Sequence, residues 1–270
     1  MSGCVSIFEN WYTSNNAGKD DMTVTHQDEL DGLKAIGRIV ADAIGAMAAA
    51  VRPGVTTAEL DAIAGRLLDE AGAMPAPRAA YGFPGVACIS VSEEIAHGIP
   101  GDRVVKAGDL INLDVSASKD GFFADSGASF AVSPVPARLD RLCRDGRRAM
   151  WAGIGAVAPG RPLAGVGRAV GAFARKNGYT LVRNLGSHGV GRALHEEPTD
   201  IATWPDPHER RVITEGLVFT VEPFLSLGAE WADDGDDAWT LYSEPPAPTV
   251  QFEHTIVATR NGPVVVTLPS

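Results

Sequence analysis

The sequence has few cysteines, no long apolar run and no surplus of basic residues. Its three cysteines, Cys4, Cys88 and Cys143, are widely spaced, so at least one stays unpaired and no disulfide framework or cysteine zinc motif is recognisable. No apolar run approaches the roughly 20 residues that cross a bilayer, and residues 1–21 lack the charged start and apolar stretch of a secretory signal. These absences predict a cytoplasmic protein with no membrane partner, in which residues 1–21 form a flexible tail.

The net charge of -11 at pH 7 excludes another class of partner. A nucleic-acid surface needs clustered Lys and Arg, which this sequence does not supply, so we expect no nucleic acid to bind. What the sequence does have is 270 residues with 45% hydrophobic content. A chain of this kind can bury a large core, as one large α/β domain or two small ones.

Apolar residues at three- and four-residue steps predict two helices at the start of the patterned chain. The first is predicted to begin at a capping pair, Thr25 with Asp28, and to end before Pro53. The second is predicted to begin at Thr56 and to end at Gly72.

The signals that end these helices recur later in the chain. The Pro-Gly pair at 53–54 returns at 159–160, and Gly178 follows the second pair at the distance at which Gly72 follows the first. Strand-like runs follow both helical pairs, at 86–91, 109–116, 121–132, 217–221 and 250–259. This pattern predicts two similar α+β halves, although chance similarity between amphipathic helices stays open. The Asp- and Pro-rich segment 229–249 is expected to be a surface excursion within the second half.

Two aspartates in apolar, strand-like sequence flank a predicted hairpin turn. If the turn centres between Lys119 and Asp120, Asp114 and Asp125 lie directly opposite each other; if it centres on Asp120 and Gly121, they are diagonal neighbours. Both registers place the two aspartates on one face. Two like charges this close repel, so either one carboxyl is protonated or a multivalent cation lies between them, and the apolar surroundings favour the cation.

Three further residues extend this acidic set. Glu222 ends the run LVFTVE, Glu253 lies within TVQFEHTIV, and His188 lies on a glycine-flanked segment. Taken singly, Asp114 could be a strand-end or turn residue, Asp125 could cap a bend, and Glu222 could be a solvated strand end. His188 alone could be a hydrogen-bonded structural histidine. Together, four carboxylates and one imidazole balance two divalent ions that share carboxylates. The order Asp, Asp, His, Glu, Glu therefore favours a two-metal hydrolytic centre.

Five sequence blocks resemble the type I methionine aminopeptidases, which have the pita-bread fold. The blocks lie at 88–100, 111–130, 187–198, 219–225 and 251–257, in the order and spacing of that family. The resemblance extends over nearly all of residues 22–266. It implies an α+β fold with pseudo-two-fold halves and a curved antiparallel sheet covered by helices, in a single catalytic domain over residues 22–270.

The resemblance also implies a role for each metal-binding candidate. Asp125, His188, Glu222 and Glu253 would hold one divalent ion, and Asp114, Asp125 and Glu253 the other, with Co, Mn, Fe or Zn as the metal. Glu222 would also shuttle the proton of the attacking water. The free amine of the substrate would bind the metal nearer Asp114, so a blocked amine would not be cleaved.

Two histidines match nonligand active-site histidines of the family. His97 is implied to donate a proton near the scissile nitrogen, and His195 to lie near the substrate carbonyl. Phe83, Leu194 and Trp239 are implied to form the methionine pocket. The remaining histidines are expected to be structural: His26, His208 and His254.

Four positions depart from the family pattern and affect the shape of the pocket rather than the metal ligands. Ser92 stands where the family usually has Asn, Ser187 replaces the usual Gly, and Pro77 and Ala80 replace bulkier pocket residues.

The implied activity is removal of the N-terminal methionine from nascent proteins and peptides, with preference for a small second residue. The implied partners are peptide or nascent-protein N-termini and, transiently, the ribosome, and the chain is expected to be a monomer. A related aminopeptidase P or prolidase would use the same five ligands, but such relatives usually carry an added N-terminal domain. A noncatalytic peptide-binding homologue is the other alternative, and the retention of His97, His195 and all five ligands argues against it.

Overall fold

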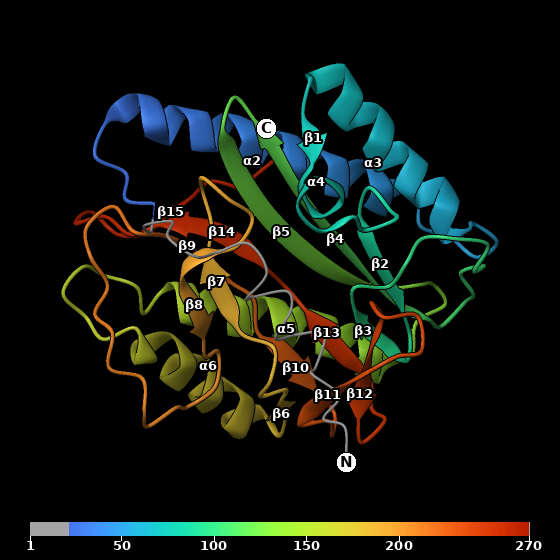
Figure 1. Cartoon of the computed structure of the whole chain (residues 1–270). Coiled ribbons are helices and arrows are strands. Elements are labelled where there is room, and N and C mark those ends of the chain that lie inside the picture. The colour runs from blue at the N-terminus through green and yellow to red at the C-terminus, as the bar shows by residue number, and fades with distance from the viewer. Residues whose placement is uncertain (1–21, 270) are drawn as a thin grey trace, which may run out of the picture.

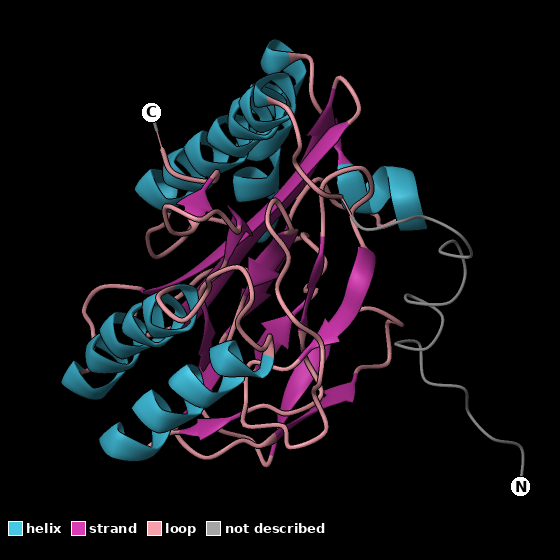
Figure 2. Cartoon of the chain, turned by 90° about the vertical axis from the view of Figure 1, so that its left-hand side faces the viewer, coloured by secondary structure: helices cyan, strands magenta, loops and turns pink. Residues whose placement is uncertain are grey.

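The computed structural model describes residues 22–269, which contain two helix pairs, the short helix α4 (Ala76–Tyr81) and a set of antiparallel strands. The expected tail, residues 1–21, lies outside the described residues. The first pair is α2 (Gln27–Ala50) and α3 (Thr57–Ala71), and the second is α5 (Ala137–Ile154) and α6 (Ala164–Asn177). Figure 1 shows the two pairs at opposite ends of the molecule, and in Figure 2 both lie on the same side of the strands. Within residues 22–269, no helix is long and apolar enough to cross a membrane.

Helix α2 begins later than predicted. His26 occupies the N-cap position, and the carboxylate of Glu29 accepts hydrogen bonds from the backbone N–H groups of Thr25 (2.8 Å) and His26 (3.2 Å). The predicted pairing of Thr25 with Asp28 is therefore wrong by one residue at each position. Glu29 is the third residue of the helix, where a carboxylate reaches back to the first unpaired N–H groups.

Helix α3 begins and ends as predicted. Thr56 Oγ1 accepts from the backbone N–H of Glu59 (3.2 Å), and the Glu59 carboxylate accepts from the backbone N–H of Thr56 (2.8 Å). Gly72 ends the helix in the left-handed conformation (φ 65°), and Gly178 ends α6 in the same way (φ 77°).

The two Pro-Gly signals make equivalent contacts in the two halves. The N–H of Gly54 donates to the carbonyl of Val105 (2.9 Å), and the N–H of Gly160 donates to the carbonyl of Ile213 (2.8 Å). Both glycines have positive φ, 95° and 80°. Repetition of the same contact at the same place in each half supports duplication over chance similarity.

Within residues 22–269, the strands form four antiparallel groups. In the first half, β4 (Leu110–Lys119) pairs with β1 (Met74–Pro75), β2 (Cys88–Val91) and β5 (Phe122–Ala131). A five-stranded sheet in the second half has the order β15 (Val264–Val265), β14 (His254–Val257), β9 (Val218–Val221), β7 (Ser187–Gly189) and β8 (Glu196–Ile201). A further group is β13 (Thr249–Gln251), β10 (Phe224–Ser226) and β6 (Thr180–Leu181).

The fourth group of strands includes part of segment 229–249, so the prediction that this segment is a simple surface excursion is wrong. The segment forms a hairpin of β11 (Trp231–Asp234) and β12 (Leu241–Glu244), and β12 pairs with β3 (Glu94–Ala96) of the first half. The predicted strand at 250–259 is also interrupted. The ladder breaks at Glu253, whose N–H donates to the carbonyl of Gly127 on β5 (2.8 Å), so the interruption joins the two halves.

Each half has its own apolar core between its helix pair and its strands. In the first half, α2 and α3 bury Ile36, Met47 and Leu60 against Leu113 of β4. In the second half, α5 and α6 pack against Phe219 of β9. The acidic site lies on the strands that join these two cores.

Candidate metal centre

The hairpin of β4 and β5 fixes the relation between the two aspartates. Asp120 and Gly121, with φ of 52° and 80°, form its two-residue turn, as expected for an Asp-Gly hairpin. Asp125 pairs with Ser116, so it lies diagonally across the ladder from Asp114. Of the two predicted registers, the structure has the diagonal one.

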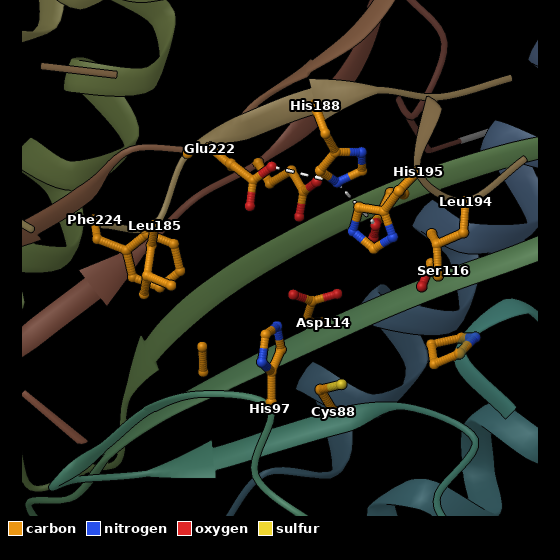
Figure 3. A pocket seen from close by; sticks show the side chains of 15 residues that line it. Cys88, His97, Asp114, Ser116, Leu185, His188, Leu194, His195, Glu222 and Phe224 are labelled. Carbon is orange, nitrogen blue, oxygen red and sulfur yellow. Dashed lines mark ion pairs between the residues drawn. The ribbon is translucent and has the colours of Figure 1, made fainter. Parts of the chain in front are cut away.

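The other three predicted ligands come from the second half. His188 lies on β7, Glu222 directly follows β9, and Glu253 directly precedes β14. His188 Nε2 lies 3.8 Å from a carboxylate oxygen of Asp125 and 3.5 Å from one of Glu222. Ligand atoms of Asp125, His188 and Glu253 all lie within 4.8 Å of one another. All five predicted ligands line one pocket, and Figure 3 shows His188 and Glu222 facing Asp114 across it.

Several buried polar groups hold these side chains in place. Thr220 Oγ1 donates to Glu222 Oε1 (2.6 Å), and Gln251 Nε2 donates to Glu253 Oε2 (2.9 Å). His188 Nδ1 lies 3.0 Å from the carbonyl oxygen of Gly189. Because a carbonyl only accepts, Nδ1 carries the imidazole proton and Nε2 presents its lone pair to the pocket.

Burial shifts the pKa of every member of the set. It raises the pKa of Asp125 to about 7 and raises the pKa values of Glu222 and Glu253 well above the usual range. Burial, and then the charge of Asp125, does the same to the pKa of Asp114. Burial lowers the pKa of His188 to about 4, so its imidazole is neutral at pH 7 and able to act as a ligand.

The residues present fit divalent metal ions. Asp125 Oδ1 and Glu253 Oε1 are buried and have no hydrogen-bond partner among the described residues. The residues of the described chain that line the pocket include no Lys or Arg to balance the four carboxylates. Buried carboxylates without partners are costly, whereas oxygen donors with one imidazole suit Mn, Fe, Co or Zn.

His97 and His195 line the same pocket as the candidate ligands. The rings of His188 and His195 have centroids 4.1 Å apart. His97 follows β3 with a positive φ of 54°, and Gly98 comes next, where a Cβ would lie 2.3 Å from the Ile89 carbonyl oxygen. Burial, and then the neighbouring His188, lowers the pKa of His97 to about 4; burial also lowers the pKa of His195. Both imidazoles are therefore neutral at pH 7.

Of the three residues predicted for the methionine pocket, Leu194 is in the lining. Phe83 and Trp239 pack against each other edge to face, with centroids 5.2 Å apart, and neither belongs to the described residues that line the pocket. The apolar part of the lining also includes Leu185 and Phe224, which the sequence reasoning missed.

The sequence reasoning also missed residues that contact the site. Thr220 and Gln251 each lie two positions before a glutamate of the set, and the period of two along a strand was a signal that could have found them. Cys88, in the pocket lining, pairs with Asp114 across β2 and β4. The hydroxyl of Tyr81 lies 2.6 Å from a ring nitrogen of His195, and no local pattern predicts that contact.

The structural roles expected for the remaining histidines agree with their surroundings. His26 is the N-cap of α2, and His208 is exposed in a loop. His254 Nδ1 lies 2.9 Å from Thr267 Oγ1, and its ring lies beside Trp151. The departure at position 187 has a structural use, since Ser187 Oγ accepts a hydrogen bond from the N–H of Glu222 (3.0 Å).

Comparison with known proteins places this geometry in a family. Residues 31–260 match metallopeptidase family M24. The chain is 43% identical over 247 residues to "Methionine aminopeptidase 2" of Bacillus subtilis, a match that covers 91% of this chain and 99% of that protein. It superimposes on the crystal structure of methionine aminopeptidase from Rickettsia prowazekii with a TM-score of 0.87 at 32% identity, covering 92% of this chain and 100% of that one.

A more distant likeness shows the fold alone. The prolidase from Pyrococcus furiosus gives a TM-score of 0.71 at 19% identity, over 92% of this chain and 66% of that one. The predicted pita-bread fold is thus confirmed at the level of architecture. On the family match and the relatives of higher identity, the chain belongs to metallopeptidase family M24 and, within it, to the type I methionine aminopeptidases.

Proposed function

We propose that this protein removes the N-terminal methionine from proteins and peptides by metal-dependent hydrolysis, with preference for a small second residue. The observation that carries the proposal is the convergence of four buried or partly buried carboxylates and one neutral imidazole in a single pocket. That donor set lies in a chain whose relatives at 43% and 32% identity are named methionine aminopeptidases.

The donor set supports a two-ion assignment. Asp125, His188, Glu222 and Glu253 would hold one divalent ion, and Asp114, Asp125 and Glu253 would hold a second, as Co, Mn, Fe or Zn. Bound ions supply Lewis acidity, which lowers the pKa of a water and polarises the scissile carbonyl. The unpartnered oxygens of Asp125 and Glu253, the two residues that would belong to both sets, favour this assignment.

The protein's own groups would move the protons. Glu222, held by the hydroxyl of Thr220, would accept the proton of the attacking water and pass it to the leaving nitrogen. His97 would donate a hydrogen bond near the scissile nitrogen, and His195 would donate one to the substrate carbonyl oxygen. Leu194, together with Phe83 and Trp239, would contact the methionine side chain.

A peptide assay tests the activity. We expect the purified protein, with Co or Mn added, to release methionine from Met-Ala-Ser, to lose activity in EDTA and to regain it when metal is returned. N-acetylated Met-Ala-Ser is the control and should stay intact, because its amine is blocked. Preferential cleavage of Xaa-Pro peptides would favour a prolidase-type activity, and inactivity with every divalent metal would favour a noncatalytic peptide-binding protein.

Metal content tests the two-ion assignment separately. Equilibrium dialysis against Mn followed by elemental analysis should give two ions per chain, and fewer in Asp114→Ala. Two ions in Asp114→Ala would contradict the assignment.

The remaining proposals concern the protein in the cell. Residues 22–270 act as one catalytic domain, and the protein is a cytoplasmic monomer that meets nascent chains during transient association with the ribosome. Analytical ultracentrifugation tests the oligomeric state. Co-sedimentation with translating and empty ribosomes tests the association, and a chain absent from both ribosome pellets would contradict it.

A further inference from the structure

A tyrosine from the first half of the chain contacts an active-site histidine from the second half. Tyr81 is the last residue of α4 (Ala76–Tyr81), and Gly82 ends that helix in the left-handed conformation, with φ 74°. The Tyr81 hydroxyl lies 2.6 Å from Nδ1 of His195, and the two ring centroids are 5.5 Å apart. The hydrogen bond spans 114 residues of sequence and joins the halves at the pocket.

This contact bears on which ring nitrogen of His195 carries the proton. A neutral imidazole has one N–H donor and one acceptor nitrogen, and its partners decide which is which. The pKa of Tyr81 is raised to about 12 by burial and then by the charge of Asp125, so the hydroxyl keeps its proton at pH 7. A protonated hydroxyl can donate to Nδ1, and the imidazole proton then resides on Nε2.

The composition of the pocket favours the same tautomer. His195 lines a pocket that also contains four carboxylates. Each of these carboxyl groups, ionised or protonated, has an oxygen that can accept from an Nε2–H group, whereas an ionised carboxylate cannot donate to an Nε2 lone pair. Only the Nε2–H form can also donate to a substrate carbonyl oxygen, because an unprotonated nitrogen accepts and does not donate.

We propose that Tyr81 is a positioning residue that holds His195 in the Nε2–H tautomer, so that the imidazole donates to the substrate carbonyl. The catalytic consequence rests on the proposed aminopeptidase function. The tautomer itself is a property of the protein alone and is measurable without turnover.

The kinetic test is a double-mutant cycle on Met-Ala-Ser. Tyr81→Phe keeps the ring and removes the hydroxyl, so we expect kcat to fall about tenfold with KM little changed, as for loss of one hydrogen bond of ordinary strength. In the His195→Ala background the same change should have no further effect. Equal losses in both backgrounds, or an unchanged kcat in Tyr81→Phe alone, would overturn the proposal.

A matched control separates loss of this hydroxyl from loss of any partly buried tyrosine hydroxyl. Tyr179 donates to Asp145 (2.9 Å), and neither residue lines the pocket. Tyr179→Phe therefore loses a similar hydrogen bond and should keep the wild-type kcat and KM. A tenfold fall in kcat in this control would also count against a specific role for Tyr81.

A spectroscopic test decides the tautomer independently of activity. In metal-free protein labelled with ¹⁵N-histidine, two- and three-bond proton–nitrogen couplings should report Nε2–H for His195, and the His195→Ala spectrum identifies its signals. Tyr81→Phe should convert that signal to a mixture of tautomers. An Nδ1–H tautomer in the wild type, or an unchanged one in Tyr81→Phe, would refute the proposal. If the wild type cleaves no Met-Ala-Ser with any metal, the proposed function fails, and the spectra still decide the role of Tyr81.

Discussion

Replacement of Gly127 by alanine is expected to disturb the metal centre without changing any ligand. Gly127 lies on β5, and a Cβ added there would be 2.2 Å from Gln251 Oε1 and 2.6 Å from its Nε2. The Gln251 side chain has little room to move, because the residue is 1% exposed and both its amide oxygen and its amide nitrogen are hydrogen-bonded. Its Oε1 accepts from Asn112 Nδ2 (2.8 Å), and its Nε2 donates to Glu253 Oε2 (2.9 Å).

The size of the effect follows from these contacts. Overpacking a buried position costs about 1–3 kcal/mol, and disturbing the two hydrogen bonds of Gln251 adds about 1–2 kcal/mol. We therefore expect Gly127→Ala to lower the free energy of unfolding of the metal-free protein by about 2–5 kcal/mol. Because Glu253 loses the group that orients it, the affinity for Mn should also fall, by about tenfold or more.

Urea unfolding and calorimetric titration with Mn measure the two effects. The matched control is Gly45→Ala in α2, where an added Cβ meets nothing within 4 Å. That change should leave Mn affinity unchanged and raise stability by up to about 1 kcal/mol, since alanine is the better helix former. If Gly127→Ala unfolds and binds Mn like the wild type, Gln251 can move at no cost, and the claim that it orients Glu253 is refuted.

Three further predictions concern other parts of the molecule. Asp114→Ala should abolish release of methionine from Met-Ala-Ser whereas His254→Ala should not, and retained activity in Asp114→Ala would contradict its role as a ligand. Gly37→Ala should lower the free energy of unfolding by about 1–3 kcal/mol, and with it the Tm, because the added Cβ would lie 2.2 Å from the backbone carbonyl oxygen of Val266. An unchanged thermal melt would argue against this. For Asp145, burial raises the pKa, but hydrogen bonds from Tyr179, Arg141 and Arg148 outweigh it and lower the pKa overall. The ionised Asp145 therefore stabilises the fold above the unfolded pKa of about 3.9, and this stabilisation is lost as the pH falls through the lower folded pKa. The free energy of unfolding of Asp145→Asn should accordingly lie furthest below that of the wild type at pH 7, and the difference should shrink below about pH 4.

Local signals in the sequence predicted the parts of the site that local structure determines. The Asp-Gly turn and the apolar alternation around it placed Asp114 and Asp125 on one face before the register was known. The cap at Thr56 and the left-handed end at Gly72 were equally local, and both are confirmed. The start of α2 was misplaced because two neighbouring acidic residues can serve the same cap, and only geometry selects Glu29.

Contacts between distant segments left no comparable signal. Strand β7 has three residues, too few to show a period, so His188 was identifiable by resemblance and by its glycine neighbours alone. The segment that contains the hairpin of β11 and β12 resembles an acidic, Pro-rich loop, because the pairing partner of the hairpin, β3, lies far away in the sequence. The same reason hides the contact between Tyr81 and His195.

The equivalent turns at Gly54 and Gly160 show that the two halves share a backbone arrangement. The two halves nevertheless contribute different residues to the pocket. Asp114 and Asp125 come from one half and His188, Glu222 and Glu253 from the other. A chain cut in the connector between β5 and α5 would give two fragments, each with its own core and an incomplete set of donors. Cation uptake by the mixed fragments would then measure how faithfully they reassemble.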